Sequence, residues 1–140
     1  MLEDIYNQTV TILNKLKRTD STTGLDEWHK TVLNNVAWYT DSARSAGGSS
    51  VFIGTYITVL IPFNDKYLPY LEWRELSNKE EYFTISTGDY IILGDIEETF
   101  DASNIVKAIE KYGENVCLVR HHNAAYNRFG AKVQLKIEGV

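Results

Sequence analysis

YFTISTGDYIILGD, residues 82–95, is the stretch of sequence that decides the expected fold. Two runs rich in β-branched and aromatic residues, 83–85 and 90–93, flank Thr87-Gly88-Asp89. Glycine supplies the positive φ that a tight turn requires, so the pattern predicts a β-hairpin.

The second run of this hairpin is apolar on both faces. Ile91 and Leu93 lie two residues apart and share one face of a strand, whereas Tyr90 and Ile92 share the other. Such a strand is covered on both sides, so it belongs inside a sheet or barrel.

The remaining β signals surround this stretch. Runs of alternating apolar residues predict strands within 5–16, 28–38, 51–62, 116–122 and 131–137. Asn34-Asn35 interrupts the second run and predicts a bend or bulge. The apolar spacing from Ser103 to Tyr112 predicts one helix that covers an open end of the sheet. We therefore expect a mainly β (α+β) fold, a small barrel or sandwich of about six or seven strands.

Composition favours one domain, residues 1–140, in an ordinary soluble protein. Cys117 is the only cysteine, which excludes an internal disulfide and fits a reducing cytoplasm. The uncharged run from Ser45 to Phe63 is diluted by Gly, Ser and Pro, so we expect no membrane segment. The first residues carry acids where a secretion signal has cations, and we expect no signal peptide.

Charge argues against a protein that grips nucleic acid. Lys and Arg number 14 against 19 Asp and Glu, for a formal net charge of -5. Acids dominate residues 65–101 and bases dominate the chain after Asn115. This asymmetry has two interpretations, a head-to-tail contact between copies or a solvated surface with chance clustering.

Two connections are long. Residues 40–50 combine adjacent glycines with little apolar mass, which predicts a mobile loop near Asp41 to Val51. The connection from Pro62 to Glu81 holds Tyr67, Tyr70 and Trp73, aromatic residues that can pack it over the barrel as a lid.

No motif for catalysis or cofactor binding is present. His121 and His122 come closest to a metal site, with His29 as a third candidate, but neighbours on a strand point to opposite faces. We therefore expect no enzyme activity and no catalytic, cofactor-binding or metal-binding residues. The many aromatic residues leave one alternative, a barrel that binds a small ligand or oligosaccharide.

Several short motifs occur in a distinctive order along almost the whole chain. They are Asp20-x-Thr-Thr23-Gly24, Trp28-x-Lys30-Thr31-Val32-Leu33, Val36-x-Trp38, the Gly/Ser loop, Ile61-Pro62, the connection around Trp73, residues 83–94, Lys111-Tyr112 and Asn127-Arg128-x-Gly130. This order resembles the small head-tail connector proteins of long-tailed bacteriophages and prophages, the head-closure or stopper group. In the last strand Gln134-Leu135-Lys136-Ile137 stands where that group commonly has a His-Trp pair.

The resemblance implies a ring of identical subunits in the neck of the virion, made in the host bacterial cytoplasm. Such a ring stacks beneath the portal protein, seals the DNA-filled head and docks a tail completion protein, close to packaged double-stranded DNA but without specific binding. We expect such subunits to join through sheet edges and through the aromatic connection, with Tyr67, Tyr70 and Trp73 at the interface. A tail terminator or another neck protein is the alternative within this class.

The resemblance also assigns the Gly/Ser loop to the central channel, where it acts as a gate. The residues are Asp41, Ser42, Ala43, Arg44, Ser45, Ala46, Gly47, Gly48, Ser49, Ser50 and Val51.

Overall fold

The computed structural model describes residues 6–47, 50–126 and 132–140, and places side chains for 6–40, 56–123 and 134–140. Its strands form a closed barrel in the order β1-β2-β3-β6-β5-β4, in which all neighbours are antiparallel. The expected small, mainly β barrel is therefore confirmed, with six strands.

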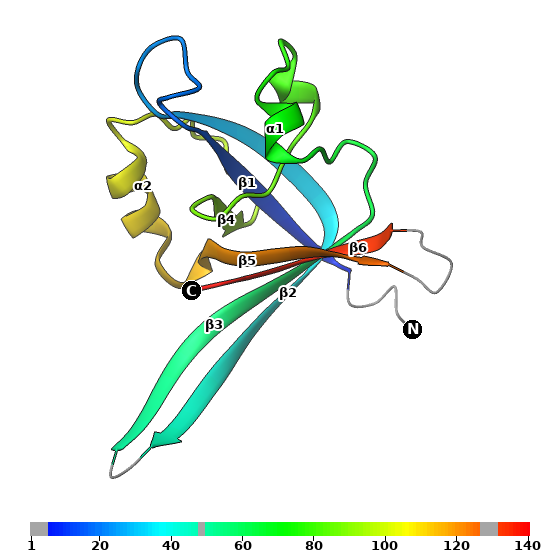
Figure 1. Ribbon diagram of the computed structural model, residues 1–140. Coiled ribbons are helices and arrows are strands. Elements are labelled where there is room, and N and C mark those ends of the chain that lie inside the picture. Colours follow the sequence, from blue (N-terminus) through cyan, green and yellow to red (C-terminus); the bar gives the residue numbers. More distant parts are fainter. Residues whose placement is uncertain (1–5, 48–49, 127–131) are drawn as a thin grey trace.

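The elements have the following bounds. The strands are β1 (Gln8–Leu16), β2 (Glu27–Gly47), β3 (Ser50–Pro62), β4 (Tyr90–Leu93), β5 (Val116–Tyr126) and β6 (Lys132–Gly139). The helices are α1 (Tyr70–Trp73) and α2 (Ile105–Tyr112), with 3-10 turns η2 (Lys79–Glu81) and η3 (Gly113–Asn115). Figure 1 shows α1 at one end of the barrel and a long hairpin of β2 and β3 leaving the other end.

The barrel interior is filled by apolar side chains that alternate along the strands. Val10 and Ile12 of β1 point inward, as do Val59 and Ile61 of β3. The other buried members of this cluster are Val36, Ile57, Phe83, Ile85, Ile91, Cys117, Val119, Leu135 and Ile137. Fully burying each large aliphatic side chain stabilises the fold by about 1.5–3 kcal/mol, so this cluster is the main source of stability.

Helix α2 covers the barrel from outside. Its Ile105 and Ala108 pack with Leu13 of β1, Ile92 of β4 and Val116 of β5 in a second buried cluster. Ile91, the neighbour of Ile92, points into the barrel, and both side chains are fully buried. The predicted helix and the strand covered on both faces are thus confirmed.

Strand β2 bends where the sequence predicts it. Asn35 adopts a positive φ of 61°, a conformation that Asn tolerates better than most residues. The pairing of β1 with β2 shifts register at the same place, between Gln8 and Val10. The bulge turns the end of β2 away from β1, so the strand continues beyond the barrel.

The predicted hairpin around Gly88 is wrong in its first strand. Strand β4 pairs with β1 and β5, whereas residues 83–85 form no strand and make one isolated bridge, between Phe83 and Tyr67. The turn itself is present: Asp89 N–H donates to Ser86 C=O at 3.0 Å, and Gly88 has φ 98°.

A side chain takes the place of the missing strand partner. Asn14 Oδ1 accepts a hydrogen bond from Thr84 N–H at 3.2 Å, and its amide nitrogen donates to Thr84 C=O. The Thr84 backbone is therefore satisfied by a side chain and not by a strand ladder, and Phe83 N–H donates to Lys66 C=O at 3.0 Å. Phe83 and Ile85 lie two residues apart, and both join the barrel core, as the alternation of an extended segment places them.

Candidate functional site

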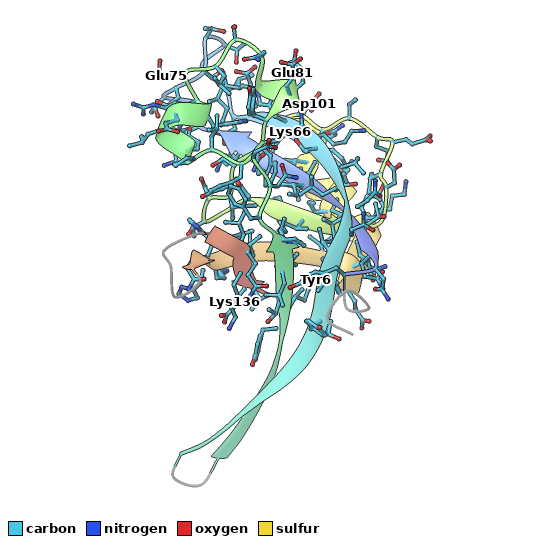
Figure 2. The ribbon with its side chains drawn as sticks, turned by 90° about the vertical axis from the view of Figure 1, so that its right-hand side faces the viewer. Tyr6, Lys66, Glu75, Glu81, Asp101 and Lys136 are labelled. Carbon is cyan, nitrogen blue, oxygen red and sulfur yellow. The ribbon has the colours of Figure 1, made fainter. Side chains whose placement is uncertain are left out.

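The most distinctive surface feature is the arm, defined here as residues 41–47 of β2 and 50–56 of β3. Its pairing runs from Asp41↔Tyr56 to Gly47↔Ser50 without interruption. Six residue steps at about 3.3 Å each give an extension of about 20 Å. Both views show the arm leaving the end of the barrel that lies opposite α1 (Figures 1 and 2).

The arm corrects the predicted irregular loop near Asp41 to Val51. Residues 41–47 and 50–51 belong to strands, and only Gly48 and Ser49 of the predicted segment lie outside the described residues. The prediction considered only whether the segment's own apolar side chains could order it. It missed that the two halves lie opposite each other and supply each other's backbone hydrogen bonds, which need no apolar side chains.

Both long edges of the arm lack a strand partner within the described part of the chain. Strand β6 pairs with β3 only from Ile57 to Pro62, and β1 pairs with β2 only up to Val36. Proteins commonly protect such edges with charges or Pro, yet residues 41–55 contain only Asp41 and Arg44 as charged residues and no Pro. A two-stranded ribbon of this kind is marginally stable by itself.

The structure bears on two predictions for the aromatic connection, its interface role and its packing over the barrel. Trp73 is fully buried and packs edge-on against His29, with ring centroids 5.4 Å apart. It therefore cannot contact a second subunit, which corrects its assignment to an interface. Tyr70 is half-buried and its hydroxyl donates to Asp20 Oδ2 at 2.8 Å. Tyr67 is also half-buried and packs near Phe83. The expected packing of this connection over the barrel is confirmed.

The exposed apolar residues of this connection are Phe63 and Leu71, which are 50% and 65% exposed. Neither was singled out from the sequence, because the aromatic residues around them gave the stronger hydrophobic signal. These two side chains, not Trp73, are available to a neighbouring molecule.

The end of the barrel that carries α1 has exposed charges of both signs. Figure 2 shows Glu75, Glu81 and Asp101 in that half of the molecule together with Lys66, and Lys136 toward the arm. All five side chains are exposed. The acid-rich stretch noted in the sequence thus contributes to one end of the molecule, although Lys136 has Glu138 as an ion-pair partner at 3.5 Å.

One buried carboxylate was missed by sequence reasoning. Asp89 is 1% exposed, and its carboxylate accepts hydrogen bonds from Lys15 N–H at 3.0 Å and from Ser86 N–H and Asn14 Nδ2 at 2.9 Å. Burial raises the pKa of Asp89 to about 6, and these donors oppose the rise. The sequence signal for this site is Asn14 within a strand together with Asp89 in a turn. The two residues were interpreted separately, so the hydrogen bond between them was not predicted.

Two further side chains with shifted pKa values are Cys117 and His29. Burial raises the pKa of the Cys117 thiol to about 12, as expected for a structural cysteine. Burial also lowers the pKa of His29, which lies against Trp73 rather than near His121 or His122. Among the residues that the structure describes, no three His, Cys, Asp or Glu side chains are placed to hold a metal ion.

The described helices are all too short or too polar to cross a membrane. Comparison with curated proteins gives no match, and comparison with solved structures gives none. One family profile matches residues 5–140, nearly the whole sequence. The chain belongs to a family of unknown function (DUF6751).

Proposed function

We propose that the chain is a structural protein of a bacteriophage neck. It acts as a head-closure subunit that forms a ring beneath the portal protein, seals the DNA-filled head and docks the tail. The observation that carries the proposal is the arm, a two-stranded extension of about 20 Å on a compact barrel. The order of motifs from Asp20 to Gly130, which resembles the stopper group, supports it further.

The arm suits a ring because its two edges remain available for pairing. In a ring of identical subunits, the outer edge of β3 in one copy lies near the outer edge of β2 in the next, and main-chain hydrogen bonds join them. Each copy then gains a partner on both sides, which stabilises ribbons that are marginal alone.

The composition of the arm suits a channel that carries DNA. No charged residue occurs from Ser45 to Phe63. Basic side chains on a channel wall would neutralise phosphates and retain DNA, whereas an uncharged wall lets it slide. The same segment closes the channel when the arms converge, so the arm acts as the gate.

The barrel surface completes the interface. Leu71 of α1 presents exposed apolar area at the end of the barrel opposite the arm, where we place the contact with another neck component, and Phe63, which follows β3, is exposed as well. This replaces an interface built on Trp73.

The ligand-binding barrel receives less support. Its interior is occupied by the buried apolar cluster, and one of the three tryptophans, Trp73, is fully covered by protein. A tail terminator forms rings as well, but it would cap the tail tube and not the portal. Its loss would therefore leave filled heads sealed.

Shortening the arm tests the proposal. Removing residues 45–47 and 50–52 deletes the three facing pairs Ser45↔Phe52, Ala46↔Val51 and Gly47↔Ser50, and it keeps 48–49 as the connection. This shortens the arm by about 10 Å without changing the register of the remaining pairs. We expect an unchanged barrel by circular dichroism, and filled heads that lose DNA, measured as DNA accessible to nuclease.

The matched control is Val106→Ser, which alters an exposed residue of α2 away from the arm. Heads that carry this variant should stay sealed. Immunoblotting of purified heads shows whether each variant is incorporated. Heads that contain the shortened chain and retain their DNA as the control does would contradict the gate.

A further inference from the structure

A cavity of about 470 Å³ opens where β1 ends, between the β1–β2 connection and the turn that precedes β4. Three cationic side chains line it, those of Lys15, Lys17 and Arg18, together with hydroxyl groups of Ser86 and Thr87. The β1–β2 connection, which lines the cavity, follows the pairing of Leu16 with Glu27 and lies at the end of the barrel opposite the arm (Figure 1).

The two carboxylates in this cavity are already occupied. Asp89 accepts hydrogen bonds from Lys15 N–H, Ser86 N–H and the Asn14 amide. Asp26 accepts a hydrogen bond from Arg18 N–H at 2.9 Å, and its other oxygen lies 3.5 Å from Lys15 Nζ. The carboxylates therefore hold the backbone that shapes the cavity, and Asp26 offsets the charge of Lys15.

The charges of Lys17 and Arg18 remain unpaired. Lys17 Nζ lies over the Tyr70 ring, 5.2 Å from its centroid, and has no ion pair within the described residues. The Arg18 guanidinium has no hydrogen bond or ion pair to any described side chain, and both residues are exposed. Three cations against two carboxylates leave a formal charge of +1 on walls that belong to a chain of net charge -5.

The neighbouring cavity has the opposite character. It is lined by Leu25, Trp28 and Phe100 with the carboxylates of Asp26, Glu27 and Asp101, and it contains no Lys or Arg. Lys and Arg side chains therefore line this cavity and not its neighbour, and a local excess of cations on an acidic molecule attracts an anion.

We propose that the cavity beside the β1–β2 connection binds a phosphate-class oxyanion, held by Arg18 and Lys17 with the Ser86 hydroxyl as a further donor. A guanidinium presents a planar fork of N–H groups that matches two oxygens of a tetrahedral anion, and an ammonium adds a point charge. Thr87 Oγ1 is engaged with Arg120 C=O at 3.4 Å and keeps the turn in place. The anion comes from one of two sources, a free phosphate compound or the backbone of duplex DNA.

Titration of the isotope-labelled chain with sulfate, followed by NMR at neutral pH and constant ionic strength, tests the site. We expect saturable shifts confined to the amides of residues 17–19 and 86–88. Arg18→Ala should weaken binding roughly tenfold, because it removes hydrogen bonds to a charged group. Arg18→Lys should recover part of the affinity, and Lys17→Ala should also weaken binding.

Lys66→Ala is the matched control, because Lys66 is an exposed lysine outside the cavity. It should leave the affinity unchanged. Equal affinities of the Arg18→Ala and Lys66→Ala variants would overturn the proposal, as would shifts that never saturate and spread over many surface lysines. Because Arg18 is exposed, its substitution leaves the fold intact, which the unchanged remainder of the spectrum verifies.

Two further titrations identify the source of the anion. The affinity for inorganic phosphate is compared with the affinity for a short duplex, expressed per phosphate group. Equal affinities assign the cavity to free phosphate compounds. A duplex that binds more tightly, with affinity that falls steeply with salt and depends on Arg18, assigns it to DNA. Absence of binding by sulfate, phosphate and duplex at low ionic strength refutes the site.

Discussion

Asp89 makes the stability of this protein depend on pH in an unusual direction. Its carboxyl is almost completely buried, and burial raises its pKa from 3.8 to about 6. At pH values between 3.8 and about 6, the Asp89 carboxyl holds a proton in the folded chain that it has released in the unfolded chain. The contribution of Asp89 to stability is therefore complete below about pH 4 and is lost as the pH rises through about 6.

The size of the effect follows from the shift. A difference of about two pKa units corresponds to about 3 kcal/mol of unfolding free energy over the whole range. Between about pH 5 and about pH 7.5 the expected loss is about 1.4 kcal/mol. Asp89→Asn removes the titrating group and therefore the slope that it produces. The Asn amide also faces N–H donors that a carboxylate satisfied, so the variant is less stable at every pH.

Urea unfolding of both proteins at several pH values measures the difference. The diagnostic quantity is the unfolding free energy of the natural sequence minus that of Asp89→Asn, which should fall as the pH rises. Carboxyls whose pKa is lowered by hydrogen bonds, such as Glu98 and Asp101, are present in both proteins and cancel. A difference that rises with pH would show that the three N–H donors outweigh burial, and would refute the reasoning.

Two further substitutions test the packing. Gly139→Ala would place a methyl group 2.1 Å from Leu118 C=O and 2.5 Å from Cys117 Sγ, so β6 must shift, and we expect a loss of about 1–3 kcal/mol in thermal unfolding. An unchanged melting temperature would mean that β6 and β5 are further apart. Trp73→Ala should cost about 3–5 kcal/mol in urea unfolding because it empties a buried site, whereas Leu71→Ser should change stability by less than about 0.5 kcal/mol. Similar effects of these two variants would contradict the burial of Trp73 within one chain.

The sequence was most informative where local pattern and tertiary environment agree. The alternation in β1, the break at Asn35 and the apolar spacing of α2 each predicted the element that is present. The paired apolar residues Ile91 and Ile92 predicted a strand covered on both faces, and the two buried clusters occupy those faces. In these elements, burial of one face decides the structure. Buried apolar residues then recur in the sequence with the period of the strand or helix.

The failures occurred where the backbone is satisfied by distant groups. Residues 83–85 resemble a strand, but Asn14, about seventy positions away, replaces the strand partner. The arm resembles a loop, because its order depends on two facing segments and not on apolar content. Trp73 was placed in an interface because a sequence does not distinguish an aromatic residue buried in its own chain from one that binds a neighbour.

The most direct test of the proposed function is the mass of the complex that the chain forms with the portal protein from the same genome. Native mass spectrometry should show the portal ring with a complete ring of chains bound, and the chain shortened in its arm should bind incompletely or dissociate. A chain that remains monomeric at all concentrations and gives no mass increase with the portal would contradict the account.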